Sequence, residues 1–86
     1  MTKQEKRDIV ARKATEEFFR ILDIHGCFGS AHEGYAVLLE EVDELWDEVR
    51  KNRSQRSKKA MFLEAKQIAA VAMKFMLMLN LCFDED

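Results

Sequence analysis

Three glutamates recur at helical spacing in the middle of the 86-residue sequence, at positions 40, 41 and 44. Glu40 and Glu44 are one helical turn apart, as are Glu41 and Glu44, so all three carboxylates project from one side of a helix. Like charges so placed repel each other by about 0.2–0.5 kcal/mol per pair. A bound divalent cation would reverse that sign, because hard ions such as Mg²⁺ prefer carboxylate oxygens. The alternative to a metal site is an acidic helix face that is solvated and binds no ion.

A fourth glutamate, Glu64, falls in a much more apolar segment. A carboxylate is costly to bury unless it has a partner. That partner is either a metal ion or a cationic side chain, and for the latter the candidates are Lys74 and a residue of the first helix. On a helix, Glu64 shares one stripe with Ile68, Val71, Phe75 and Met78.

Antiparallel packing of the helices that carry these acids would place Glu64 and Gln67 opposite Glu41 and Glu44. The second histidine of an H-E-x-x-H zinc site is missing after His32-Glu33. No nucleophile pair, phosphate-binding glycine loop or E-x-x-H di-iron pattern is present either. The acidic residues are therefore the strongest candidates for chemistry in this sequence.

The elements that position these residues are predicted to be three helices. The spacing of apolar residues predicts helices over about 3–23, 30–51 and 58–81. The chain has no proline, and its three glycines lie close together between the first two segments. Ser30 and Glu33 form the pattern of a capping box at the start of the second helix. Its apolar face is predicted to comprise Tyr35, Leu38, Leu39, Val42, Leu45, Trp46 and Val49, with the acidic residues opposite.

The third helix is apolar on nearly every side, so it must be buried on every side. Two partner helices of the same chain cannot cover it completely. A chain of this length hides only about 60% of its surface as a monomer, yet 48% of its residues are hydrophobic. We therefore predict an all-α fold in which a single domain, residues 1–86, forms a helical bundle by assembling as a dimer or tetramer.

The overall composition limits the partners and the cellular location that we expect for the protein. A net charge of −2 gives no reason to expect a nucleic-acid polymer as partner. The basic run over residues 50–59 lacks interleaved aromatics and is interpreted as a solvated linker between helices. No segment reaches the roughly 20 apolar residues that cross a bilayer, and no apolar signal region follows the N-terminus. Cys27 and Cys82 form neither a C-x-x-C pair nor a dense disulfide framework, which favours reduced thiols and a cytoplasmic location.

The acidic residues resemble a known signature. Glu40-Glu41-Val42-Asp43-Glu44, followed by nineteen residues and then Glu64-Ala65-Lys66-Gln67, resembles the E-E-x-x-E…E-x-x-D pattern of MazG-like proteins. These belong to the all-α nucleotide pyrophosphohydrolases, together with the dimeric dUTPases and the phosphoribosyl-ATP pyrophosphatases. The resemblance covers roughly residues 30–78.

The resemblance implies Mg²⁺-dependent, or Mn²⁺-dependent, cleavage of a (deoxy)nucleoside triphosphate to the monophosphate and pyrophosphate. Glu41, Glu44 and Glu64 would be metal ligands, and Glu40 would be a further ligand or would orient the attacking water. Lys74, or a basic residue of the linker over residues 50–59, would contact phosphate oxygens of the substrate.

Two features depart from the family pattern. Gln67 stands where aspartate is usual, which replaces a charged ligand by a weak neutral one. The chain also ends soon after the third helix, where family members commonly have a fourth. Either departure is compatible with a changed substrate, a weaker metal site or lost catalysis. The alternative function is a non-catalytic helical oligomerisation module that keeps the bundle and not the chemistry.

Overall fold

The computed structural model describes residues 1–82, and this part of the chain is all-helical with no strand. Its helices are α1 (Lys3–Ile24), α2 (Ala31–Val49) and α3 (Lys58–Leu81), and a short 3₁₀ helix, η1 (Arg53–Gln55), lies between α2 and α3. The three predicted helices are confirmed, with ends that differ by no more than two residues. None of the described helices is long and apolar enough to cross a membrane.

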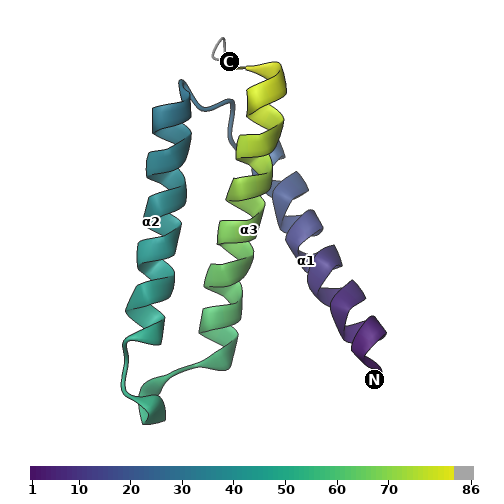
Figure 1. The fold of residues 1–86 in the computed structure, drawn as a ribbon, viewed down its shortest axis with the longest axis vertical. Coiled ribbons are helices and arrows are strands. Elements are labelled where there is room, and N and C mark those ends of the chain that lie inside the picture. The colour runs from purple at the N-terminus through teal and green to yellow at the C-terminus, as the bar shows by residue number, and fades with distance from the viewer. Residues whose placement is uncertain (83–86) are drawn as a thin grey trace.

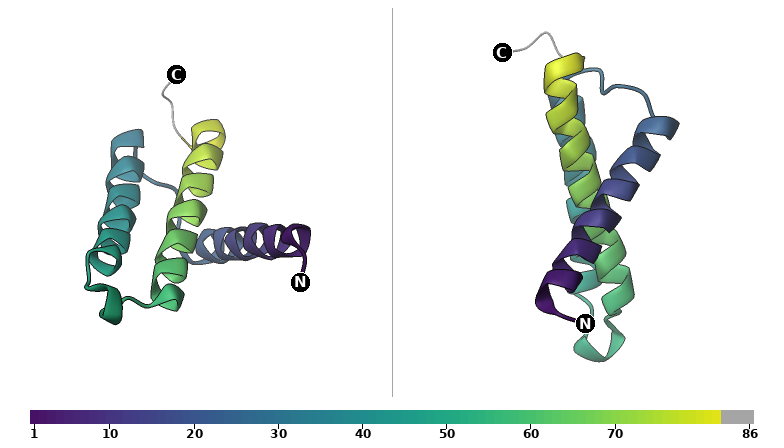
Figure 2. Two further views of the ribbon diagram at one scale, coloured as in Figure 1. Left: turned by 60° about the horizontal axis from the view of Figure 1, so that its bottom comes forward. Right: turned by 90° about the vertical axis from the view of Figure 1, so that its right-hand side faces the viewer.

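The helix α3 is the centre of the arrangement. It packs against α2 on one side and α1 on the other, and in the described part of the chain α1 and α2 do not pack against each other. Figure 1 shows α2 and α3 side by side and antiparallel, joined at the lower end by η1. In Figure 2, α1 crosses α3 at a wide angle and diverges from α2. The fold is therefore an antiparallel hairpin with a third helix laid across one side.

Side-chain caps set the helix starts. The Ser30 hydroxyl accepts a hydrogen bond from the backbone N–H of Glu33 at 3.1 Å, as predicted. The Glu33 carboxylate does not return the bond; it lies over Gly29 instead, 2.7 Å from where a Cβ atom on that residue would be. The full reciprocal capping box forms at the start of α1, between Thr2 and Glu5.

The core of the single chain is thin. No large side chain in the described part of the chain is fully buried, and several large apolar side chains are exposed. A helix whose apolar positions remain exposed gains little of the burial that normally stabilises it. The buried apolar residues are Ile21, Phe28, Ala70, Val71 and Met78.

The apolar face predicted for α2 is only partly covered within the single chain. Tyr35 and Trp46, the two aromatic residues of that face, are 61% and 59% exposed. The side of α2 that meets α3 instead carries Gly34, Val37, Leu38, Glu41 and Leu45. The acidic Glu41 is thus turned towards the neighbouring helix, and the apolar stripe formed by Tyr35, Leu39, Val42 and Trp46 is turned outwards.

Gly34 explains this rotation of α2. A Cβ atom on Gly34 would lie 2.7 Å from the Phe75 ring and 2.9 Å from the Phe28 ring. The two rings occupy the space that a Cβ atom at position 34 would need. The helix α2 can therefore approach α3 this closely because residue 34 is glycine. Because residues at i, i+3, i+4 and i+7 share a face, this contact also places Val37, Leu38 and Glu41 against α3.

The two cysteines are joined in a disulfide, Cys27 to Cys82, with their Cα atoms 6.4 Å apart. The expectation of two reduced thiols is therefore wrong for this structure. The fold brings the segment between α1 and α2 against the C-terminal end of α3, so residues 55 positions apart in the sequence become neighbours. The bond ties the loop that carries Phe28 to the C-terminal end of α3.

Candidate metal centre

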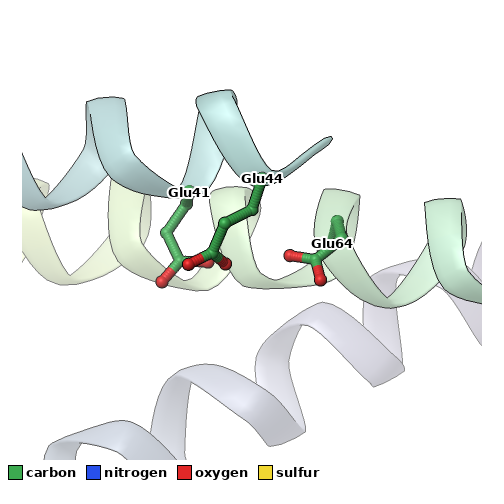
Figure 3. Close-up of side chains that lie close together, drawn as sticks. All are labelled: Glu41, Glu44 and Glu64. Carbon is green, nitrogen blue, oxygen red and sulfur yellow. The ribbon is translucent and has the colours of Figure 1, made fainter. Parts of the chain in front are cut away.

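Three carboxylates converge where α2 and α3 pack together. One oxygen from each of Glu41, Glu44 and Glu64 lies within 4.8 Å of the other two. Figure 3 shows Glu41 and Glu44 reaching from α2 and Glu64 from α3, with their carboxylates directed towards one another. The antiparallel hairpin thus brings together three of the residues that the sequence singled out. We call these three residues the carboxylate trio.

The trio is electrostatically unfavourable without a cation. Burial raises the pKa of Glu41 to about 7, and the negative charge and hydrogen bond of Glu44, the charge of Glu64 and that of Glu40 add to the rise. Burial likewise raises the pKa of Glu64, reinforced by Glu44 and by Glu48. A divalent cation would favour the ionised forms and remove this penalty.

No lysine or arginine of the described residues forms an ion pair with the trio. In particular, Glu64 pairs neither with Lys74 nor with a residue of α1, which were the alternatives to a metal. Three oxygen atoms at this separation, supplemented by water, match the hard ligands that Mg²⁺ and Mn²⁺ accept.

Glu40 lies outside the trio. It is exposed on α2, and it acts on the site only through its charge, as the weakest of the influences on the pKa of Glu41. Its separation from Glu41 follows from the helical period, since adjacent residues point about 100° apart.

Gln67 faces both the site and α1. It borders the same cavity as Glu41, and its Nε2 donates a hydrogen bond to Glu17 at 2.5 Å. Glu17 is buried and also accepts two hydrogen bonds from Arg20. The hydrogen bond with Arg20 is the main reason that the pKa of Glu17 falls to about 2, against the opposing effect of burial.

The sequence reasoning missed Glu17 and Arg20. The signal was present, because Glu17 lies on a helical stripe with Ala14 and Ile21, and an acid on an apolar stripe was the criterion that singled out Glu64. No local pattern indicates that the hydrogen-bond partner of Glu17 is Gln67, which follows 50 residues later.

A cavity of about 430 Å³ is lined by Glu41, which is one member of the trio, and by Lys74 of α3. Only 4% of Lys74 is exposed, and its ammonium lies 4.3 Å from the centre of the Phe28 ring. Burial lowers the pKa of Lys74, while the charge of Glu33 opposes that shift. The cavity is lined by Arg20, Ile21, His25, Gly26, Cys27, Phe28, Glu33, Val37, Glu41, Gln67, Val71 and Lys74.

The raised pKa of Glu41 predicts a pH-dependent stability without divalent cations. The folded state holds this proton up to about pH 7, whereas the unfolded chain releases it near 4.5. The free energy of unfolding should therefore fall as the pH rises from about 4.5 to 7, and the Glu41 contribution to that fall should be about 1–3 kcal/mol after allowance for solvent screening. Urea unfolding in a chelator, compared with Glu41→Gln, isolates the effect. Equal pH profiles for the two proteins would contradict it.

The chain was compared with models of protein families, with curated proteins and with solved structures, and none of them matches it. The MazG-like pattern at residues 40–44 and 64–67 therefore remains a prediction from the residues themselves.

Proposed function

We propose that this protein is a Mg²⁺-dependent nucleotide pyrophosphohydrolase that cleaves a (deoxy)nucleoside triphosphate to the monophosphate and pyrophosphate. The observation that carries the proposal is the convergence of Glu41, Glu44 and Glu64 without a cationic partner, beside a cavity of small-molecule size. Acids that repel one another in the resting protein are stabilised by the cation that the reaction needs.

Each residue of the site would have a distinct role in the reaction. Glu41, Glu44 and Glu64 would hold the cation, with Gln67 as a neutral oxygen ligand. When bound, the cation would neutralise the polyphosphate and lower the pKa of a coordinated water. Glu40 would be a further ligand or would orient that water. Attack of that water would break the phosphoanhydride bridge between the α- and β-phosphates, and with loss of a proton from the water it would yield the monophosphate and pyrophosphate.

Lys74 would contact the substrate inside the cavity. Its buried ammonium has no ion pair among the described residues and rests on the Phe28 ring. Lys74 follows Glu64 by ten positions on α3, which is about 15 Å of helix. Because Lys74 and Glu41 nevertheless line the same cavity, a nucleotide bound there could place a phosphate oxygen near the Lys74 ammonium.

We also propose that a second copy of the chain covers the outward stripe of α2. Tyr35, Leu39, Val42 and Trp46 are all exposed, and their spacing of four, three and four residues is that of a coiled-coil seam. Pairing of this seam with its counterpart would add the burial that the thin core of one chain lacks. The assembly would be a dimer or tetramer. The disulfide between Cys27 and Cys82 removes the reason for expecting a cytoplasmic location.

The second candidate function is a non-catalytic helical oligomerisation module. One observation favours it: the Gln67 amide is hydrogen-bonded to Glu17, so the position usually occupied by a charged ligand is neutral and already engaged. In this case the trio would be a relic of the chemistry and would bind no metal.

Thermal melting and pyrophosphate release separate the two functions. A ligand that binds only the folded state raises its midpoint, so Mg²⁺ at ten times its dissociation constant should raise the melting temperature by about 5–10 °C. Pyrophosphate should be released from at least one member of a panel of canonical and modified nucleoside triphosphates. A melting temperature insensitive to Mg²⁺ and Mn²⁺, together with no turnover of any nucleotide, would leave only the oligomerisation module.

A further inference from the structure

Glu17 is a buried acid that the proposed reaction does not use. It is 6% exposed, and its carboxylate is held from two sides. Arg20, one turn away on the same helix, donates through Nε at 2.8 Å and through Nη2 at 2.5 Å. Gln67 donates from α3. Arg20 already supplies the charge that burial of a carboxylate requires, so the bond to Gln67 needs a separate explanation.

The bond to Glu17 fixes which atom of the Gln67 amide faces the cavity. A glutamine amide carries a donor nitrogen and an acceptor oxygen on one carbon, and the two point in different directions. The nitrogen is directed to Glu17. The one side-chain hydrogen bond of Gln67 among the described residues is the one that its nitrogen donates to Glu17, so its side-chain oxygen Oε1 accepts none, and Gln67 borders the cavity together with Glu41. The oxygen is therefore the amide atom left for the site.

We propose that Glu17 and Arg20 are positioning residues that hold the Gln67 carbonyl oxygen towards the carboxylate trio, where it acts as a ligand of the bound cation. The proposal rests on the metal centre of the proposed function. Oxygen is the atom that Mg²⁺ and Mn²⁺ bind, and the reversed amide would present an N–H group, which cannot bind either ion. The arrangement also accounts for glutamine at this position, because a carboxylate so close to Glu17 would be repelled by it.

The test is a double-mutant cycle on Mn²⁺ affinity, measured by electron paramagnetic resonance without nucleotide. Glu17→Gln and Gln67→Leu should each weaken Mn²⁺ binding about 10–100-fold, the usual range for residues that orient metal ligands. In the Gln67→Leu background, Glu17→Gln should have no further effect, because Glu17 acts only through Gln67. Losses that multiply would overturn the proposal, as would an unchanged affinity in Glu17→Gln.

Glu16→Gln is the matched control. It removes the same charge from the neighbouring residue of α1, where Glu16 forms an exposed ion pair with Arg12. Its Mn²⁺ affinity should equal that of the wild type. A role for Glu17 in fastening α1 to α3 alone would lower the melting temperature of Glu17→Gln and leave its Mn²⁺ affinity unchanged. If Glu17→Gln does not fold, Arg20→Lys, which keeps the charge and loses the paired hydrogen bonds, should still weaken Mn²⁺ binding; no change would overturn the proposal.

The outcomes also separate this proposal from the proposed reaction. A wild-type protein that binds Mn²⁺ but hydrolyses no nucleotide would refute the hydrolysis, and the cycle would still decide the role of Glu17. Hydrolysis with an additive cycle would refute the positioning role alone. A wild-type protein that binds no Mn²⁺ would refute the metal centre and this proposal together.

Discussion

Replacing Glu41 by glutamine is expected to reduce pyrophosphate release at least about 100-fold and to remove the stabilisation by Mg²⁺. Glu41 is the member of the trio that also lines the cavity, so its carboxylate would face both the cation and the substrate. Loss of a residue that merely orients a ligand costs about 10–100-fold, and loss of a ligand should cost at least as much. The measurements are kcat/KM for the best nucleotide of the panel and the melting temperature with and without Mg²⁺.

The same substitution should leave the metal-free protein at least as stable as the wild type above pH 7. A residue whose neutral form is favoured by burial and by three neighbouring acids destabilises the fold when it ionises. Loss of activity with gain of stability is the sign of a functional site and not of damaged packing. Asp43→Asn is the control, because Asp43 is exposed on the same helix outside the trio. A fully active Glu41→Gln enzyme would refute the assignment.

If the chain assembles through α2 as proposed, replacing Trp46 by glutamate should convert the assembly to monomers. Trp46 is 59% exposed in the single chain and belongs to the outward stripe of α2. A charge on a self-complementary apolar seam would be buried without a partner, and two copies would repel each other. Since an aromatic hot-spot contact at an interface is typically worth about 2 kcal/mol or more, the dissociation constant should rise at least about 30-fold. Sedimentation velocity at several protein concentrations measures this change.

Phe19→Glu is a suitable comparison for Trp46→Glu. Phe19 is also an aromatic residue with 59% of its surface exposed, but it lies on α1 and outside the stripe. Its substitution should leave the assembly intact if the stripe is the interface. A wild-type chain that is a well-folded monomer at micromolar concentration would refute the self-association proposal outright.

The helices could be predicted from the sequence because their signals are local. The apolar spacing, the glycines between residues 26 and 34 and the Ser30 cap act within a few residues of one another. The proximity of Glu64 to Glu41 and Glu44 could also be predicted, since a short connection between two helices favours antiparallel packing.

The rotation of α2 was not predictable from hydrophobicity alone. A helical wheel weights side chains by polarity, and on that measure Tyr35 and Trp46 belong inside. The structure instead turns Gly34 towards α3, where the rings of Phe28 and Phe75 leave no room for a Cβ atom. Close approach of two backbones at a glycine depends on a partner far along the chain, which no local pattern specifies.

The position of α1 has a consequence for how the site is assembled. Glu44 and Glu64 are 20 positions apart and belong to one hairpin, whereas Glu17 and Gln67 are 50 apart. The entropic cost of closing a loop grows with its length, and local contacts tend to form first. Since α3 is the one described helix against which α1 packs, the hairpin can bring the trio together before α1 docks. The final docking would then fix the amide of Gln67, so that the last step of folding would also complete the ligand set.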